Sequence, residues 1–159
     1  MAFTTDNNRT SDNLPDGEYE VIIKAAFRDV SKTSGKNNLT LRMVVRNDID
    51  WQDGQNRVIF HRLWKRKEPT SADRQCEDFG CTDINRVSKA VGFADKQSFD
   101  SIDAWLGELG GKTLRVTVKT ENDYFNVKKM EPTQYPICNH KWAADQAAER
   151  NVDNENLPF

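Results

Sequence analysis

The eleven residues Arg57–Lys67 concentrate the side chains whose chemistry is most informative. They read RVIFHRLWKRK, with five Lys or Arg residues, no acid, and the rings of Phe60, His61 and Trp64 between the cations. Cations can follow the phosphates of a nucleic acid while flat rings stack on unpaired bases. This combination favours binding of single-stranded nucleic acid. An amphipathic strand with a solvated basic face is the alternative interpretation.

Residues on neighbouring segments extend this candidate surface. Residues 39–46 alternate between apolar and polar, so Arg42 and Arg46 are expected to point away from the apolar side. Trp51 follows in a connection rich in Asp, Asn and Gly. The predicted DNA-binding residues are Lys36, Arg42, Arg46, Trp51, Arg57, Phe60, Arg62, Trp64, Lys65, Arg66, Lys67, Lys119 and Tyr124.

The orientation of residues 57–67 decides which rings are available to a ligand. Successive side chains of a strand point to opposite faces, so one set must fill the interior. We favour the register in which Ile59 and Leu63 point inward, because it leaves Arg62 in solvent and only His61 buried or at the rim. The residues that then face solvent are Phe60, Arg62 and Trp64. The opposite register, with Trp64 in the core, is the alternative.

Two other chemistries are less well supported. Cys76 and Cys81, with Cys138 and His140, could supply the ligands of a zinc site, but two polar loops would have to meet and the spacing is wider than the usual C-x2-C pairs. We therefore expect free cysteines, no metal and no cofactor.

The sequence also lacks the catalytic signatures of common enzymes. It contains no G-x-S-x-G, no phosphate-binding glycine-rich loop and no H-E-x-x-H. Asp48, Asp50 and Asp53 could bind Mg²⁺ as nuclease carboxylates do, although such Asp- and Asn-rich loops are usually solvated turns. We expect a protein that is not an enzyme.

The elements that must position these residues follow from periodicity. Alternation predicts strands over 18–30, 39–46, 57–67, 112–120 and 124–130. In the first strand, Tyr19, Val21, Ile23, Ala25 and Phe27 share the apolar face, and its length suggests a bent strand serving two parts of a barrel. Two helices are predicted between the third and fourth strands, through 84–91 and 102–109. Thr82 or Asp83 is the expected cap of the first helix, and Ser98 or Asp100 that of the second.

This order matches the oligonucleotide/oligosaccharide-binding (OB) fold, a small Greek-key barrel of five strands. We expect a mainly β protein with a helical insertion between strands 3 and 4. In that fold the face of strands two and three takes the ligand, and 57–67 is the third strand. The predicted organisation is a flexible N-terminus over 1–13, the OB domain over 14–136 and a flexible tail over 137–159.

The two ends of the sequence carry different signals. The polar first residues contain no signal peptide, no apolar run approaches the length of a membrane span, and three cysteines suit a reducing cytoplasm. The net charge is −2, but residues 139–159 hold four acids and two bases, so the remainder holds equal numbers of each. The tail ends in an apolar tip behind acids, a pattern suited to docking in a partner's apolar and basic pocket. The tail residues expected to bind partners are Asp153, Glu155, Leu157, Pro158 and Phe159.

Two parts of the sequence resemble known families. The tip resembles the acidic C-terminal tip of bacterial and phage single-stranded DNA-binding proteins, with Asn154 and Asn156 where that family often has Asp. The body resembles phage proteins that have been linked to single-stranded DNA binding. The matching positions are Leu14, Pro15, Gly17, Tyr19 and Val21, then Asn38, Leu39, Leu41 and Val45, then Gly111, Lys112, Val116 and Val118.

The resemblance implies a phage replication or recombination protein in the host cytoplasm that coats single strands and recruits partners through its tail. The tail could also compete with DNA for the basic groove, and the protein could form a homo-oligomer. A recombination mediator or inhibitor that uses the same barrel as a protein-interaction module is the alternative function.

Overall fold

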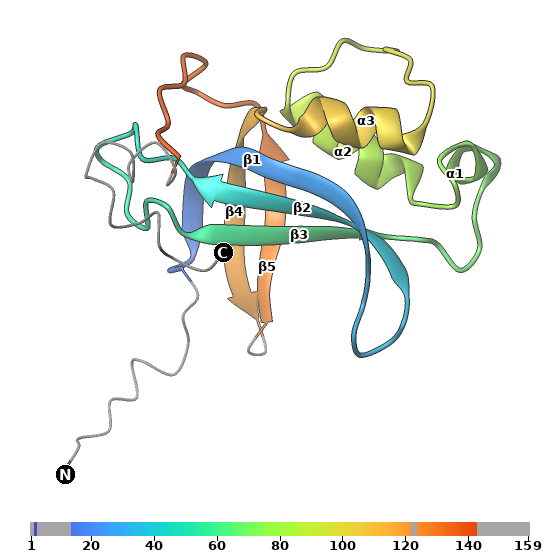
Figure 1. Cartoon of the computed structure of the whole chain (residues 1–159), viewed down its shortest axis with the longest axis horizontal. Helices are drawn as coiled ribbons and strands as arrows, with labels where there is room; N and C mark the ends of the chain where they lie inside the picture. Colours follow the sequence, from blue (N-terminus) through green and yellow to red (C-terminus); the bar gives the residue numbers. More distant parts are fainter. Residues whose placement is uncertain (1, 3–13, 122–123, 143–159) are drawn as a thin grey trace, which may run out of the picture.

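The computed structural model describes residue 2 and residues 14–121 and 124–142. Five strands and three helices occupy this part of the chain, so the mainly β prediction is confirmed (Figure 1). The elements are β1 (Gly17–Val30), β2 (Asn37–Val45), β3 (Val58–Trp64), α1 (Ser71–Gln75), α2 (Cys81–Ala90), α3 (Ile102–Leu109), β4 (Thr113–Glu121) and β5 (Tyr124–Glu131). None of the helices in the described residues is long and apolar enough to cross a membrane. The expectations for residues 3–13 and 143–159 concern residues outside the described part.

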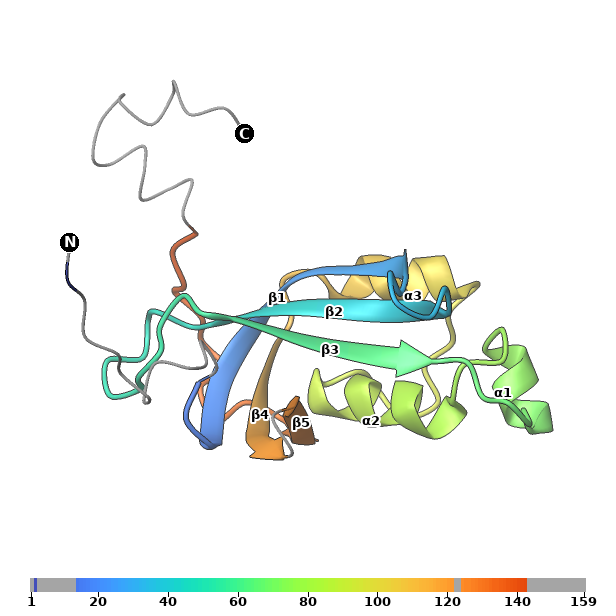
Figure 2. The ribbon, with the colours of Figure 1, turned by 90° about the horizontal axis from the view of Figure 1, so that it is seen from below.

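All five strands pair antiparallel in one open sheet of order β3-β2-β1-β4-β5. The long β1 strand is shared between two halves of this sheet (Figure 2). Its first part, Gly17–Ile22, pairs with β4, and its stretch from Val21 to Val30 pairs with β2. A bulge between Ile23 and Ala25 separates the two regions, which confirms the expected bent strand and increases its twist.

The bulge also corrects the predicted faces of β1. Tyr19, Val21 and Ile23 are buried in the core as expected. The extra residue then reverses the alternation, so Phe27 is paired with Thr40 on the opposite face and is 37% exposed. Phe27 therefore belongs to the outer surface of the sheet and not to the core.

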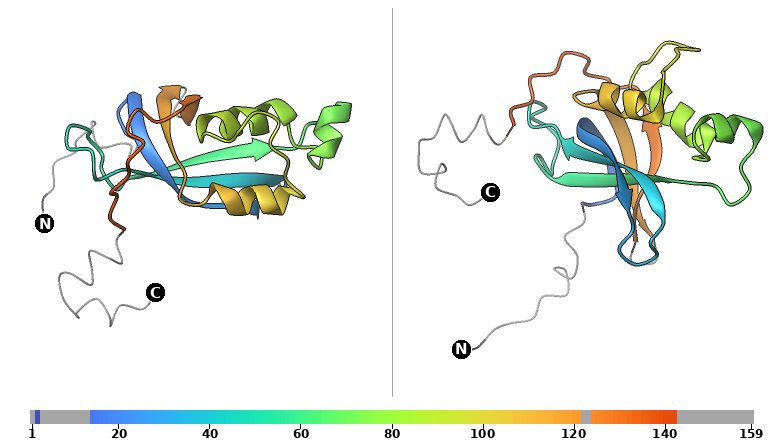
Figure 3. Two further views of the ribbon diagram at one scale, coloured as in Figure 1. Left: turned by 90° about the horizontal axis from the view of Figure 1, so that it is seen from above. Right: turned by 45° about the vertical axis from the view of Figure 1, so that its right-hand side comes forward.

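The helices and the inner side of the sheet form one apolar core. In the views of Figure 3 the helices lie together at one end of the sheet. Helix α3 contacts β1 and α2 contacts β5. Trp105 of α3 and Val87 of α2 are buried with Leu41 of β2. The opposite side of β2 and β3 is consequently left without a helical cover.

The helix boundaries differ in detail from the predictions. Gly80 precedes α2 as its N-cap, without a side-chain cap bond, whereas Ser101 caps α3 by accepting a hydrogen bond from the amide of Ala104. Neither boundary uses the caps named from the sequence. The short α1 helix was not predicted, although Thr70 and Asp73 form a capping box at its start.

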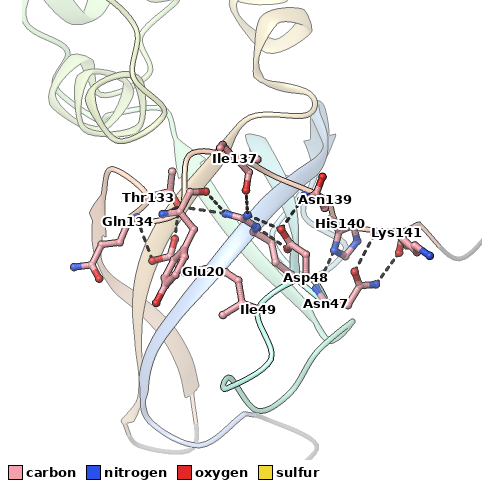
Figure 4. Close-up of polar contacts among 12 residues, drawn as sticks. Glu20, Asn47, Asp48, Ile49, Thr133, Gln134, Ile137, Asn139, His140 and Lys141 are labelled. Atoms are coloured by element: carbon pink, nitrogen blue, oxygen red, sulfur yellow. Dashed lines mark hydrogen bonds and ion pairs between the residues drawn. The ribbon is translucent and has the colours of Figure 1, made fainter.

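Residues 132–142 follow β5 as an extended segment that lies against β1 and the β2–β3 loop (Figure 4). The Ile137 carbonyl, the Asn139 amide and the His140 ring all hydrogen-bond to residues 46–48. Residues 137–141, which the prediction assigned to the tail, are thus hydrogen-bonded to the folded body as far as Lys141.

Candidate nucleic-acid interface

The outer face of β1, β2 and β3 is the side that points away from the core, and it carries a grid of rings and cations. The strand register aligns its residues in rows across the sheet: Asp29–Asn38–Trp64, Phe27–Thr40–Arg62, Ala25–Arg42–Phe60 and Ile22–Val44–Val58. Phe60 and Trp64 are 43% and 40% exposed, similar to Phe27. We call Phe27, Arg42, Phe60, Arg62 and Trp64 the ring–cation surface.

The register of β3 is the one favoured from the sequence. Ile59 and Leu63 are buried in the core, at 0% and 2% exposure. His61 points to the same side and is half-buried, and burial lowers the pKa of its imidazole below the ordinary 6.5. The outward residues are Phe60, Arg62 and Trp64, which confirms the preferred alternation.

Two guanidinium groups flank the ring of Phe60. The Cζ atom of Arg42, directly opposite on β2, lies 5.9 Å from the ring centroid. The Cζ atom of Arg62, two residues along β3, lies 5.5 Å from it. Cation–π attraction of about 0.5–1 kcal/mol at an exposed site favours these positions. The rings and the cations are therefore held side by side before any ligand arrives.

The cations of this surface are not neutralised by carboxylates. Within the described residues, neither Arg42 nor Arg62 forms an ion pair. The Nε atom of Arg42 is buried without a hydrogen-bond partner, as is the Nδ2 atom of Asn38 in the neighbouring row. Asp29 is an acid of the same face, and its carboxylate accepts a hydrogen bond from the Val30 amide. The surface thus offers positive charge together with exposed rings.

The basic residues of β4 and β5 differ in this respect. Arg115 pairs with Glu18 and is within 3.7 Å of Glu20. Lys128 pairs with Glu121 at 3.1 Å, and Lys129 pairs with Glu131 at 3.2 Å. The charges of these two lysines and of the arginine are paired with nearby glutamates, so β4 and β5 should attract a polyanion less strongly than the ring–cation surface.

The basic run continues beyond the end of β3. Lys65, Arg66 and Lys67 are all exposed. The Lys65 ammonium lies 5.3 Å from the centroid of Phe79, and Arg66 Nε lies 3.3 Å from a carboxylate oxygen of Asp73. These cations extend the positive edge next to Trp64.

A second pair of exposed rings lies at the other end of β3, where the exposed Arg57 precedes the strand. Trp51, in the β2–β3 loop, is 58% exposed and its Nε1 donates a hydrogen bond of 2.9 Å to the hydroxyl of Tyr135. Tyr135 was not among the sequence-predicted residues, because it comes from the segment 132–142. Periodicity gives no signal for its position, which depends on where that irregular segment packs.

The remaining predicted residues do not join the ring–cation surface. Lys36 is exposed in the β1–β2 connection, and Lys119 is exposed on β4, where it pairs with Asn126. Tyr124 begins β5 opposite Glu121. In Figure 2 the β1–β2 connection is well separated from the neighbouring ends of β4 and β5. Lys119 and Tyr124 therefore lie on strands that are separate from the ring–cation surface.

Arg46 was expected on the outer face, and its position is corrected. Its parity is outward, but the segment 132–142 covers it and leaves its side chain 0% exposed. The guanidinium donates to both carboxylate oxygens of Asp48, at 3.0 and 2.7 Å. It also donates to the carbonyls of Tyr135 and Ile137, at 2.8 and 3.1 Å (Figure 4). Arg46 is therefore a structural residue that is closed to a phosphate.

The environment of Asp48 follows from the same contacts. Burial raises the pKa of its carboxyl, but hydrogen bonds from Arg46 and from the Asn139 amide outweigh burial and leave the pKa below its usual value. The ionised form is thus fixed in place. The Asp48 carboxylate is therefore occupied by protein donors, whereas Asp50 and Asp53 of the same loop are exposed.

The possible zinc ligands are divided between two places. Cys76 and Cys81 lie around α1 and α2, whereas Cys138 and His140 belong to the segment 132–142. The Nδ1 atom of His140 accepts a hydrogen bond from the Asn47 amide at 3.1 Å. Over residues 14–121 and 124–142, no group of three His, Cys, Asp or Glu side chains is arranged to hold a metal ion.

A family model described as "Protein of unknown function (DUF669)" matches residues 2–149. No curated protein matches the sequence.

Proposed function

The chain belongs to the DUF669 family of proteins of unknown function, and we propose that it binds single-stranded DNA without sequence preference on the ring–cation surface. The observation that carries this proposal is the position of Arg42 and Arg62 beside the exposed ring of Phe60, with no carboxylate partner in the described residues. The protein acts by binding and needs no catalytic group for this role.

The sheet supports an OB-type fold for this activity. The order β3-β2-β1-β4-β5, with a bent β1 shared by both halves and helices between β3 and β4 in the sequence, is compatible with a five-stranded Greek-key barrel. OB folds bind oligonucleotides on the face of strands two and three. Four of the five residues of the ring–cation surface, Arg42, Phe60, Arg62 and Trp64, lie on β2 and β3.

The physical basis of binding has two parts. Stacking of a base on Phe60 or Trp64 contributes about 1–3 kcal/mol per base and tolerates any sequence, because every base has a flat face. Contacts between arginines and phosphates release counterions, so the affinity falls with salt with a log–log slope of about −0.7 per neutralised phosphate on a single strand. Phe60 and Trp64 are four residues apart on β3, a distance of roughly 13 Å along an extended strand, so they can contact separate bases.

The tail gives the protein a proposed second role. Its acids and apolar tip, Leu157–Phe159, suit docking on replication or recombination proteins of a phage-infected cell, in the host cytoplasm. The same acids could occupy the basic surface when DNA is absent. Removal of residues 151–159 then tightens DNA binding at low salt, and an unchanged affinity would reject this self-competition.

The decisive experiment is a titration with fluorescent oligo-dT across salt concentrations. We expect Trp64→Ala to lose affinity with little change in salt slope, and Arg62→Gln to flatten the slope by about one contact. Lys128→Gln is the matched control, because Lys128 is exposed and forms an ion pair with Glu121 away from the ring–cation surface. If oligo-dT neither binds nor quenches tryptophan fluorescence at low salt, the proposed function fails.

One feature favours the alternative function, a protein-interaction module. Ile137 is 80% exposed on the same segment as Tyr135, which contacts the exposed Trp51. Exposed apolar groups of this kind are common in protein interfaces. A protein that ignores oligo-dT but loses a protein partner on Ile137→Asp would support this alternative.

A further inference from the structure

A cleft of about 1010 Å³ lies in the helical part of the molecule, away from the ring–cation surface. Its walls come from the end of α1, from α2, from the connection over residues 93–101 and from the start of α3. Figure 1 shows this connection looping out between α2 and α3. Phe93 and Phe99, with ring centroids 5.1 Å apart, line the cleft, and so does Cys76. A thiol is therefore open to a ligand that enters this cleft.

A second thiol lies beside the first. Asp73 holds the two cysteine backbones together, because its carbonyl accepts from the Cys76 amide at 2.9 Å and its carboxylate accepts from the Cys81 amide at 2.8 Å. Burial, first, and the neighbouring Cys81 side chain raise the pKa of the Cys76 thiol above its ordinary value. The side-chain amide of Asn85 donates a hydrogen bond to the Cys81 sulfur at 3.4 Å. Both are free thiols and both are half-buried.

The loop between the two cysteines is shaped to bring them together. Glu77 and Asp78 have φ angles of 55° and 72°, in the left-handed region that residues other than glycine seldom adopt. The Phe79 amide donates back to the Cys76 carbonyl at 3.0 Å and closes the turn. Consecutive residues in this region persist only where the surrounding contacts determine them.

We propose that Cys76 and Cys81 form a dithiol site that closes to an intramolecular disulfide by exchange with a low-molecular-weight peptide disulfide of the glutathione class, entering through the cleft. The Cys76 thiolate attacks one sulfur of that disulfide, forming a mixed disulfide and releasing one small thiolate. The Cys81 thiolate then attacks the Cys76 sulfur and releases the second small thiolate. The two released thiolates take up, through solvent, the two protons that the Cys76 and Cys81 thiols lost. The two cysteines are oxidised, and one small disulfide is reduced to two thiols.

The charges on the cleft suit such a ligand. Lys89 and Lys96 line it and can meet the carboxylates of a glutathione-type peptide, while Asp95 and Asp100 can meet its ammonium group. An uncharged disulfide lacks both interactions. The cleft should therefore favour the charged peptide disulfide over hydroxyethyl disulfide at the same concentration.

The disulfide would act on contacts that reach the sheet. Glu77 forms a 2.6 Å ion pair with Arg28 of β1, and the Asp78 carbonyl accepts from the Arg66 amide at 2.8 Å. Closing the loop changes the geometry at both residues. This consequence for the basic end of β3 rests on the proposed function, whereas formation of the disulfide does not.

The test uses the full chain with Cys138→Ser, so that Cys76 and Cys81 are the cysteines that remain. The reduced protein is incubated with glutathione disulfide, alkylated and analysed by intact-mass and peptide mass spectrometry. We expect loss of two hydrogens, no alkylation and a Cys76–Cys81 cross-linked peptide. Stable glutathione adducts on both cysteines, or a linked dimer without the internal bond, would overturn the proposal.

Two further variants test the order of events and the cleft. With Cys81→Ser, the reaction should stop at a glutathione adduct on Cys76, and an unreactive Cys76 would overturn entry through the cleft. Lys96→Gln should slow exchange with glutathione disulfide several-fold and leave hydroxyethyl disulfide unaffected, with the exposed Lys24→Gln as control. Oligo-dT titration of the reduced and oxidised forms is read separately: absence of DNA binding in both rejects the proposed function and leaves the disulfide result standing.

Discussion

Arg46 and Asp48 form a 2.7 Å ion pair in which the arginine side chain is completely buried and the aspartate is 9% exposed. The pair lies where the segment 132–142 meets the β2–β3 loop, and the guanidinium uses its other hydrogens on carbonyls of that segment. The arginine thus joins parts of the chain that are about ninety residues apart in sequence.

Replacing Arg46 should damage the fold and not a ligand contact. Arg46→Met removes the guanidinium that donates to Asp48 and to the Tyr135 and Ile137 carbonyls. Breaking a buried pair on one side costs about 3–5 kcal/mol. Urea unfolding should show this loss, while Arg57→Met, at an exposed arginine, changes the midpoint little. An Arg46→Met protein of unchanged stability but weaker oligo-dT binding would return Arg46 to the ligand surface.

Phe27 provides a test of the role assigned to the bulge in β1. Its ring shares the outer face with Phe60 and Trp64, so Phe27→Ala should weaken oligo-dT binding by about 1–3 kcal/mol if a base stacks there. Stability should change little, since the side chain is partly exposed. Val30→Ala, at a 52% exposed position of the same strand, is the control. If the Phe27→Ala and Val30→Ala proteins bind oligo-dT with equal affinity, Phe27 does not contact the DNA and the binding surface is limited to β2 and β3.

These positions show what the sequence could and could not predict. In β3 the apolar run Val58–Phe60 left two registers open, and the register with Ile59 and Leu63 inside was favoured because it leaves Arg62 in solvent. Ile59 and Leu63 are buried in the structure, so the favoured register is confirmed. The first strand contains Ile22 and Ala26 between its alternating residues, and nothing in that pattern locates the extra residue at the bulge. Phe27 was consequently assigned to the core.

The error at Arg46 has a different cause. Local alternation gave its direction correctly, but burial depended on a segment that arrives from residues 132–142. That segment has no periodicity, and its path is set by hydrogen bonds to individual carbonyls and to Asp48. Tyr135 was missed for the same reason. Sequence periodicity therefore could not predict which residues the irregular segment 132–142 would cover or bring into the site.

Arg62 should be sensitive even to replacement by lysine. Its Cζ atom lies 5.5 Å from the Phe60 ring centroid. A planar guanidinium can stack on a ring and donate hydrogen bonds in a fixed fork, which a compact ammonium cannot do. We expect Arg62→Lys to keep the salt slope of oligo-dT binding, because the charge is retained, but to lose part of the affinity. Arg62→Gln should lose affinity and slope together. If the lysine and glutamine variants bind alike, the contribution of Arg62 is not its charge.

The contact between His140 and the Asn47 amide makes the position of the segment 132–142 dependent on pH. Burial lowers the pKa of His140 below 6.5, and its Nδ1 accepts a hydrogen bond, so the folded protein favours the neutral ring. The unfolded chain therefore binds the proton first as the pH falls, and the stability linked to this residue is present above 6.5 and declines below it. His61 is shifted in the same direction by burial and adds to the decline.

The measurement is urea unfolding between about pH 7.5 and pH 5, followed by tryptophan fluorescence. Trp142 is a suitable reporter, because its ring meets that of His140 edge-on at 4.5 Å, and Trp142→Phe identifies its signal. We expect stability to fall with pH, and His140→Gln to remove part of the slope, since its amide oxygen can accept the Asn47 hydrogen without titrating. His61→Gln separates the contribution of the second histidine. If the pH slope of His140→Gln equals that of the unaltered protein, protonation of His140 does not control how this segment is held.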